Sequence, residues 1–318
     1  TKKNLTKLFY RLKKMKIIFM GTPSFAVPTL KAIYESGHKI LEVYTQPATK
    51  SGRGQKINHS DIFNYSKKLN LKVRSPDTLE TTEEINHIKK LNPDLVVVVA
   101  YGKILPPEML NIEKLFFINA HASLLPKWRG AAPIQRAIMN LDNETGISIM
   151  KIIPQLDAGP VMLQKKIKID QEMSYKELSE KMSEIAAKLI LKSLKLIESN
   201  KANFIKQEES VATYAKKIQK NESQINWDES AKKIIAKINA LHPNPGCWFK
   251  LSETRIKIIK AIEIERTGKV GTIIDNNMTI ACSKNSVQIL ELKKEGKKQM
   301  LVEEYLKGND IKIGQRVN

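Results

Sequence analysis

The apolar run from Leu95 to Ala100, LVVVVA, constrains the fold of this chain more than any other feature. A strand with one face in water alternates apolar and polar residues, so a continuous run of this kind indicates a strand that is buried on both faces. Such strands lie at the centre of parallel sheets that helices cover on both sides. The run therefore predicts a doubly wound α/β domain. It is also much shorter than the roughly 20 residues that span a bilayer.

The segments around this run alternate as a parallel sheet requires. We expect strands at 16–20, 39–46 and 115–120, and helices at 25–36, 61–70 and 80–91. Two later apolar runs, 144–152 and 161–169, flank a turn that contains Asp157, and they resemble a hairpin-like pair at the sheet edge. Ser174 and Glu177 then form a possible capping box at the start of a long helix.

The second part of the chain has a different pattern. A length of 318 residues favours two domains, and the helical periodicity gives way to polar residues near Lys201. We therefore expect a basic extension at 1–14, an α/β domain at 15–201, a linker at 202–220 and a second domain at 221–318. In the second domain a helix at 228–241 precedes short apolar runs at 255–264, 270–276, 278–283 and 287–293. Short strands separated by Gly and Asn favour a small β-barrel.

Composition narrows the chemistry. Two cysteines are too few for a disulfide scaffold, and the histidines lack the spacing of a zinc site, which favours a metal-free protein in the reducing cytoplasm. The net charge of +21 permits a polyanionic partner such as nucleic acid, although a lysine-rich composition throughout the chain would give the same charge. Residues 1–14 contain six basic and no acidic residues, which suits either an extension of little structural importance or an organellar targeting segment.

Asn119 and His121 are the candidate catalytic pair. Residues i and i+2 emerge on one face of a strand, so the amide and the imidazole are expected to point the same way near the end of the strand at 115–120. Open α/β sheets carry their chemistry at the carboxyl ends of their strands. An amide donor beside an ionisable imidazole suits an oxyanion that forms at a carbonyl. Asp157 is the candidate carboxylate for orienting the imidazole. The three residues predict acyl transfer without a covalent enzyme intermediate.

Two loops of the sequence bear on ligand binding. The stretch GTPSFAVP, from Gly21 to Pro28, lacks both the G-x-G-x-x-G fingerprint and a lysine-containing phosphate loop, which disfavours nicotinamide and ATP binding. The stretch QPATKSGRGQKINHS, residues 46–60, is longer than a connection there needs to be, and such loops are commonly functional or mobile. Its cations Lys50, Arg53 and Lys56 predict contacts with RNA phosphates and unpaired bases.

Several separated motifs, read together and in order, resemble the folate-dependent formyltransferase family. They are NAHASLLPKWRGAAPIQ, LDAGP, AYGKILP, GTPSFAVP, QPATKSGRGQK and TYAKKI, and they extend the resemblance from Met15 to the C-terminus. The resemblance implies a Rossmann-like domain followed by an OB-like barrel, with Asn119, His121 and Asp157 as the catalytic residues. It also implies that Ser123, Leu124, Leu125 and Pro126 contribute to the site of 10-formyltetrahydrofolate, the formyl donor.

The Leu-Leu-Pro loop offers a flat pteridine an apolar wall with backbone donors, to which Ile104, Leu105 and Pro106 would add. Anchoring of this loop in the core is an alternative role for Leu124 and Leu125, and it is compatible with the first.

The resemblance also implies an acceptor and a partner. The acceptor is the α-amine of methionine esterified to initiator tRNA, and the loop that carries the G-R-G motif around Arg53 engages the acceptor arm. Basic residues of the barrel would bind RNA, among them Lys293, Lys294, Lys297 and Lys298. A monomer without membrane association is expected. The alternatives are a small amine acceptor, such as glycinamide ribonucleotide or an amino-sugar nucleotide, and a catalytically inactive RNA-binding relative.

Overall fold

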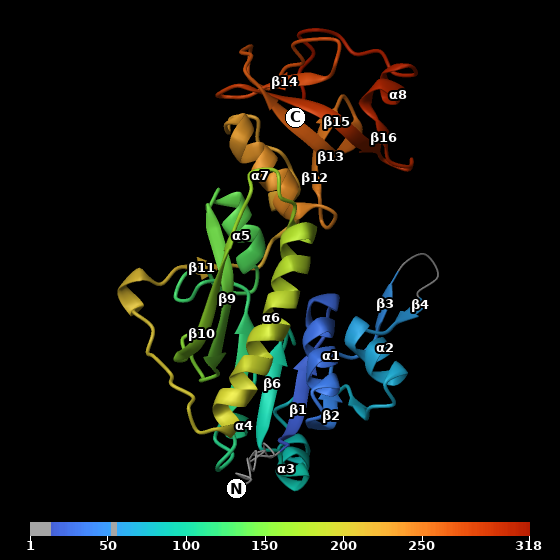
Figure 1. The fold of residues 1–318 in the computed structure, drawn as a ribbon. Helices are drawn as coiled ribbons and strands as arrows, with labels where there is room; N and C mark the ends of the chain where they lie inside the picture. The colour runs from blue at the N-terminus through green and yellow to red at the C-terminus, as the bar shows by residue number, and fades with distance from the viewer. Residues whose placement is uncertain (1–13, 52–55) are drawn as a thin grey trace, which may run out of the picture. The chain divides into compact units, whose positions relative to one another are not determined.

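The computed structural model describes residues 14–51 and 56–318 (Figure 1). The expectations for the extension before residue 14 and for Arg53 therefore lie outside the described residues. By its internal contacts the chain divides into two compact units. The first unit comprises the described residues up to His121, together with Ile147–Lys165 and Met182–Glu209. The second comprises Ala122–Gly146, Lys166–Lys181 and Ser210–Asn318.

A seven-stranded sheet in the order β10-β9-β7-β6-β1-β2-β5 organises the first half of the chain (Figure 1). Its strands are β1 (Lys16–Gly21), β2 (Lys39–Tyr44), β5 (Val73–Arg74), β6 (Leu95–Val99), β7 (Phe117–His121), β9 (Glu144–Lys151) and β10 (Val161–Lys168). The ladders from β5 to β7 are parallel, whereas β9 runs antiparallel to β7. The predicted parallel sheet and the edge position of the last two strands are confirmed, and the antiparallel addition makes the sheet mixed.

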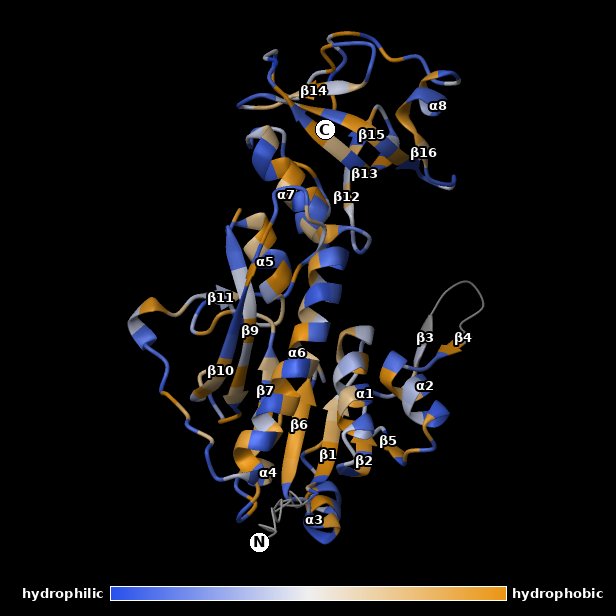
Figure 2. Cartoon of the chain, in the orientation of Figure 1, coloured by the Kyte–Doolittle hydropathy of each residue, from blue (hydrophilic) through white to orange (hydrophobic). Residues whose placement is uncertain are grey.

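The central strand is the one that the valine run predicts. All five residues of β6 are buried, and Figure 2 shows the strand as continuously hydrophobic. Val96 and Val98 pack in a core cluster with Ile18, Met20 and Tyr44 from the neighbouring strands. A strand in this position has a ladder on each edge and side chains covered on both faces, so its sequence carries no polar alternation.

Side-chain caps mark the start of some of the helices of this half. They are α1 (Val27–Glu35), α2 (Asp61–Lys68), α3 (Thr82–Leu91), α4 (Pro107–Leu110) and α6 (Tyr175–Glu198), with a 3-10 turn at η1 (Ser24–Ala26). Ser60 Oγ accepts a hydrogen bond from Phe63 N at the start of α2. The capping box before α6 is confirmed, because Ser174 Oγ accepts from Glu177 N and the Glu177 carboxylate accepts from Ser174 N.

The loops after β1, β2 and β6 are joined by hydrogen bonds to the carbonyl oxygen of Tyr101. Thr22 Oγ1 donates to the carbonyl oxygen of Tyr101 over 2.7 Å, and Gln46 Nε2 donates to the same oxygen over 3.1 Å. Gly21 ends β1 in a tight turn, where a Cβ would lie 2.9 Å from the Cβ of Ala26. The carboxyl ends of three central strands are therefore tied together. This edge is the one at which parallel sheets place their ligands.

The second unit contains a five-stranded antiparallel sheet in the order β12-β13-β15-β14, with β16 paired to β15. Its strands are β12 (Cys247–Leu251), β13 (Thr254–Ile264), β14 (Thr279–Ala281), β15 (Ser286–Lys294) and β16 (Met300–Leu301), and its helices are α5 (Pro133–Met139), α7 (Ala231–Leu241) and α8 (Val302–Leu306). Ile234, Ile238 and Leu241 of α7 pack in the same core as Phe249 and Ile256 of the sheet. The strands expected at 255–264, 278–283 and 287–293 are confirmed as β13, β14 and β15, and their pairing is antiparallel.

Two details of this half differ from the sequence-based expectation. The segment 270–276 is not a strand, because Thr272 and Ile273 make only isolated bridges there. Conversely, β12 was not expected, because its residues follow directly on the turn-rich stretch HPNPG. Its pairing with β13 buries Cys247 and Phe249, so tertiary packing recruits a segment whose local signal was a turn.

The segment expected as a linker, 202–220, is divided between the two units, with residues up to Glu209 in the first and residues from Ser210 onward in the second. Within it lie the 3-10 turns η2 (Glu209–Val211) and η3 (Lys220–Ser223) and the strand β11 (Tyr214–Ala215). β11 pairs in parallel with β8 (Arg129–Gly130). Thr213 accepts at its carbonyl oxygen from Arg129 N over 2.8 Å, and Arg136 donates from Nε to the carbonyl oxygen of Lys216 over 3.0 Å. These pairings join positions far apart in sequence.

Candidate active site

Asn119 and His121 both lie in β7, which extends one residue past the end predicted for it. Their register partners on β9 are Met150 and Ser148, respectively. Alternation along the strand puts both side chains on one face of the sheet. Asn119 is half-buried, and the imidazole of His121 is only 6% exposed. Burying two polar side chains in this way costs free energy unless each has a hydrogen-bonding or charged partner.

The carboxylate of Asp157 meets the imidazole of His121. Asp157 Oδ2 lies 3.5 Å from His121 Nδ1, and the Asp157 side chain is 15% exposed. Such a distance suits an ion pair when the imidazole is protonated. Because the carboxylate faces Nδ1, the ring presents Nε2 as its other polar atom. The structure thus brings the two residues together, in an arrangement able to hold a positively charged imidazole at a carbonyl oxygen.

Asp157 lies in the turn between β9 and β10 and has φ of 47°, in the left-handed region. Aspartate adopts this conformation more often than most residues other than glycine, although it still costs of order 1 kcal/mol. Backbone hydrogen bonds close the turn, since Lys151 N donates to the carbonyl oxygen of Pro160 over 2.9 Å. Gly159 fits against β9, and a Cβ there would collide with the carbonyl oxygen of Lys151.

Three polar side chains near this pair were not among the residues singled out from the sequence. Ser148 is fully buried and accepts at Oγ from Gln164 Nε2 over 2.9 Å. Gln207, from the segment after α6, donates to the backbone of the Asp157 turn. Ser148 stands out in retrospect as a polar residue within an apolar strand. Gln207 carries no local signal, because its partners lie about fifty positions earlier in the chain.

The residues of the predicted folate loop belong to the second unit, and they differ in exposure. Ser123 is fully buried and Leu125 is 5% exposed, whereas Leu124 and Pro126 are half-buried. Ser123 Oγ donates to the carbonyl oxygen of Lys127 over 2.5 Å, which folds the loop on itself. Leu125 thus anchors the loop, as the alternative interpretation held, and Leu124 and Pro126 remain partly available to a ligand.

Residues 104–106 were expected to add to the apolar wall of the folate site, but only the first of them is exposed enough to contact a ligand. Ile104 is 88% exposed, whereas Leu105 is 7% exposed and Pro106 is buried. Leu156, next to Asp157 in the turn, is 59% exposed. Neither Ile104 nor Leu156 is needed by the core. Both can offer apolar surface to a ligand.

The two ends of the basic loop proposed to contact RNA are short strands that pair with each other in an antiparallel ladder. β3 (Thr49–Ser51) pairs with β4 (Lys56–Asn58), and Lys50 lies opposite Ile57. Lys50 and Lys56 thus lie on the two strands, while Arg53 lies outside the described residues. Of the basic residues expected on the second domain, Lys293 and Lys294 end β15, and Lys297 and Lys298 follow in the next loop.

A basic and aromatic cluster lies on the sheet of the second unit. Trp248 on β12 pairs in register with Lys257 on β13, which in turn pairs with Lys293 on β15. The guanidinium of Arg255 lies 4.1 Å from the centroid of the Trp248 ring, a cation–π distance. Burial, followed by the charges of Lys293 and Arg255, lowers the pKa of Lys257 below its ordinary value. The cluster therefore concentrates positive charge on one part of the sheet.

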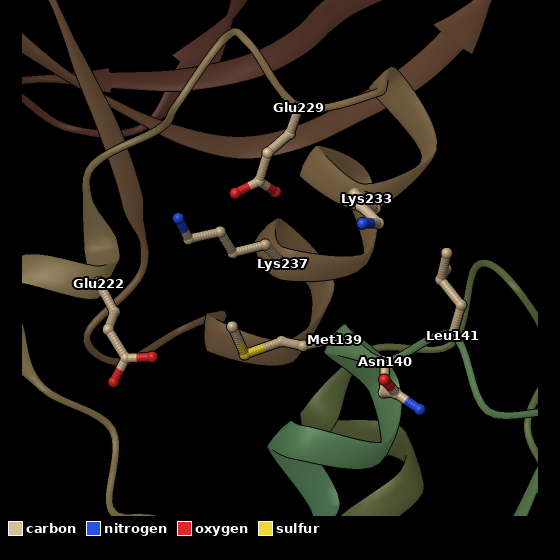
Figure 3. A pocket seen from close by; sticks show the side chains of 7 residues that line it. All are labelled: Met139, Asn140, Leu141, Glu222, Glu229, Lys233 and Lys237. Atoms are coloured by element: carbon tan, nitrogen blue, oxygen red, sulfur yellow. The ribbon is translucent and has the colours of Figure 1, made fainter. Parts of the chain in front are cut away.

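A pocket of about 410 Å³ in the second unit lies among Met139, Asn140, Leu141, Glu222, Glu229, Lys233 and Lys237 (Figure 3). Its formal charges cancel, and Lys237 extends between the carboxylates of Glu222 and Glu229. The Glu222 carboxylate is already paired with Arg136, and Lys237 Nζ donates to the carbonyl oxygen of Gln224. None of the residues singled out from the sequence lines this pocket.

Within residues 14–51 and 56–318, no cluster of three or more His, Cys, Asp or Glu side chains has an arrangement that could hold a metal ion. In the same part of the chain, no helix is both long and apolar enough to cross a membrane.

Comparison with known families identifies both halves of the chain. The model of the formyl transferase family matches residues 14–194, and that of the formyl transferase C-terminal domain matches residues 217–310. Among curated proteins, the chain is 48% identical over 304 residues to the methionyl-tRNA formyltransferase of Pelagibacter ubique (strain HTCC1062), covering 95% of this chain and 98% of that protein. It is 38% identical to the enzyme of the same name from Afipia carboxidovorans, over 93% of this chain and 97% of that protein.

Solved structures share the fold at lower identity. HypX from Aquifex aeolicus, in complex with tetrahydrofolic acid, superposes with a TM-score of 0.65 at 16% identity, covering 92% of this chain and 47% of HypX. An N-formyltransferase from Helicobacter canadensis, in complex with folinic acid and dTDP-3-aminofucose, superposes with a TM-score of 0.64 at 19% identity, covering 86% of this chain and 99% of that protein.

Proposed function

Because this chain belongs to the formyl transferase family, we propose that it transfers the formyl group of 10-formyltetrahydrofolate to the α-amine of methionine esterified to initiator tRNA. The observation that carries this proposal is 48% identity to a curated methionyl-tRNA formyltransferase over 95% of the chain. Identity on that scale extends across both domains, so it covers the catalytic and the C-terminal parts together. The reaction would supply formylated initiator tRNA for translation initiation, and we place it in the cytoplasm with the protein as a monomer.

The geometry at β7 supports a direct transfer. The neutral amine of the acceptor attacks the formyl carbon, a new nitrogen–carbon bond forms, and the bond from that carbon to N10 of the folate breaks. Asn119 donates to the carbonyl oxygen as negative charge develops on it, and His121, when protonated, adds a second donor. Asp157 Oδ2 lies 3.5 Å from His121 Nδ1, a distance at which the carboxylate can pair with the protonated imidazole. Water and Asp157 relay the proton released by the amine to N10 of the folate, which leaves as a neutral secondary amine.

The predicted folate loop, residues 123–126, supports folate as the formyl carrier. Leu124 and Pro126 are half-buried and lie in the loop that follows β7 in the chain, within five residues of His121. Ile104, in the first unit, is a strongly exposed apolar side chain able to contact a flat ring. Apolar contacts beside a few oriented polar groups are the usual composition of a small-molecule site.

Basic residues in both parts of the chain support an RNA acceptor. Lys50 and Lys56 lie on the paired strands β3 and β4 and Arg53 lies between them in the sequence, and we propose that all three contact the tRNA acceptor arm. In the C-terminal domain, the sheet carries Arg255 stacked on Trp248, and Lys293 and Lys294 lie on β15. Cations beside aromatic rings suit the backbone and the bases of RNA.

One experiment separates this proposal from its alternatives. The purified protein is incubated with 10-formyltetrahydrofolate and with initiator or elongator tRNA charged with methionine. We expect formylation of the charged initiator tRNA and much less of the elongator. Formylation of a small amine acceptor alone would assign the protein to another branch of the family. Binding of tRNA without formyl transfer would indicate a catalytically inactive relative.

Two substitutions test the catalytic pair. Asn119→Ala and His121→Ala should each lower the single-turnover rate by roughly 10²- to 10³-fold, the usual effect of removing one oxyanion donor. The affinity for the folate donor should change little, because these contacts form mainly in the transition state. Rates within a few-fold of the wild type in both variants would show that β7 does not carry the chemistry.

A further inference from the structure

Gln207 makes two short hydrogen bonds to the turn that contains Asp157. Its Nε2 donates to the backbone carbonyl oxygen of Asp157 and to that of Gly159, each over 2.7 Å. One amide group thus spans two carbonyl groups of the same turn. It is half-buried, so these bonds are partly shielded from competing water.

The segment that carries Gln207 is itself held in register. Ile205 exchanges both backbone hydrogen bonds with Val161 at the start of β10, over 2.8 Å and 2.9 Å. Gln207 is therefore two residues from a fixed point on the sheet. Because its backbone is anchored, its amide can oppose movement of the turn and need not simply follow it.

The Asp157 turn needs such a restraint. Asp157 has φ of 47°, in the left-handed region, which aspartate adopts more often than most residues but which is less favourable than the right-handed region. The direction of its carboxylate toward His121 depends on this backbone conformation. A relaxation of φ toward an ordinary value would turn the Cα–Cβ bond away and lengthen the 3.5 Å separation between Oδ2 and His121 Nδ1.

We propose that Gln207 is a positioning residue for catalysis, which holds the backbone of the Asp157 turn so that the carboxylate faces His121. This inference rests on the proposed roles of Asp157 and His121. It extends the site to a residue of the segment after α6 whose amide bonds to the backbone of the Asp157 turn. The amide acts only through the turn, so its loss should lower kcat and leave the KM values for folate and tRNA nearly unchanged.

The test uses Gln207→Met, which keeps the length of the side chain and removes its N–H donors. Gln155→Leu is the matched control, because Gln155 belongs to the same turn and is exposed. We expect kcat to fall about 10-fold in Gln207→Met, the usual effect of losing one or two hydrogen bonds, and to stay within twofold in the control. If Gln207→Met fails to fold, Gln207→Asn, whose amide has a shorter reach, should show the same selective loss of kcat.

The variant Asp157→Asn separates this inference from the proposed function. When combined with Asp157→Asn, the change Gln207→Met should add less than twofold, because the carboxylate that it positions is already gone. A full 10-fold additional loss, or an unchanged kcat in Gln207→Met alone, would overturn the positioning role. Wild-type kinetics in Asp157→Asn would instead reject the proposed role of Asp157 itself.

Discussion

The ion pair between Arg136 and Glu222 offers a sharp test of how the second unit is held together. Arg136 Nη1 lies 2.6 Å from Glu222 Oε2, and Nη2 lies 3.0 Å from Oε1, which is a bidentate pair. The same guanidinium donates from Nε to the carbonyl oxygen of Lys216. Arg136 of α5 thus fixes the segment that leads into η3 and α7. The perturbation is Arg136→Met, which keeps the apolar stem and removes the charge.

The expected magnitude follows from burial. The side chains of Arg136 and Glu222 are 18% and 28% exposed, so the pair lies between the exposed and the buried limits. Exposed pairs contribute roughly 0.2–1 kcal/mol, and removing one partner of a buried pair costs roughly 3–5 kcal/mol. We therefore expect Arg136→Met to lower the free energy of unfolding by about 2 kcal/mol. In a double-mutant cycle with Glu222→Gln, the coupling energy should be about 1 kcal/mol.

The pH dependence of this pair has a defined sign. The hydrogen bond from Arg136, together with that from the backbone of Gln219, holds the pKa of Glu222 below its ordinary value of 4.5. A carboxylate with a lowered pKa contributes stability that is complete above its unfolded pKa and is lost as the pH falls through the folded value. The coupling energy between Arg136 and Glu222 should accordingly be present at pH 7 and decline below about pH 4.5.

Tryptophan fluorescence provides the assay. The three tryptophans, Trp128, Trp227 and Trp248, all belong to the second unit, so urea unfolding followed by their emission reports that unit. A coupling energy below about 0.3 kcal/mol at pH 7 would show that the pair is screened like an ordinary surface contact, and would refute the argument from burial.

Three further predictions concern other parts of the molecule. Removing one phosphate contact with Arg53→Ala should flatten the slope of log tRNA affinity against log salt by roughly 0.7–0.9 without changing folate binding; an unchanged slope in gel shifts would exclude Arg53 as an RNA contact. Burial lowers the pKa of His38 despite the nearby Glu198, so stability should fall as the pH drops below 6.5, and unfolding curves of His38→Gln should show a weaker dependence there; equal dependence would contradict this. Burial raises the pKa of Cys247 and of Cys282 to about 12, so neither thiol should react with a disulfide reagent at pH 8 until the protein is denatured; rapid labelling of the native protein would contradict it.

The sequence alone was sufficient for the elements whose signal is local. The valine run identified β6 because a strand covered on both faces must be apolar throughout. Ser174 and Glu177 identified the start of α6, because a capping box satisfies the free N–H groups of the first turn within a few residues. Asn119 and His121 could also be placed on one face of β7 from the sequence, because the alternation of side chains along a strand depends on that strand alone.

The tertiary structure decided whatever depends on residues that are distant in the chain. β12 pairs with β13 although its own sequence reads as a turn, because packing in the core outweighs local preference. The segment 213–215 joins β8 through hydrogen bonds that no periodicity signals. The strained conformation of Asp157 and its support by Gln207 belong to the same class. A sequence pattern records which face of an element is apolar, but not which distant backbone groups a side chain will reach once the chain has folded.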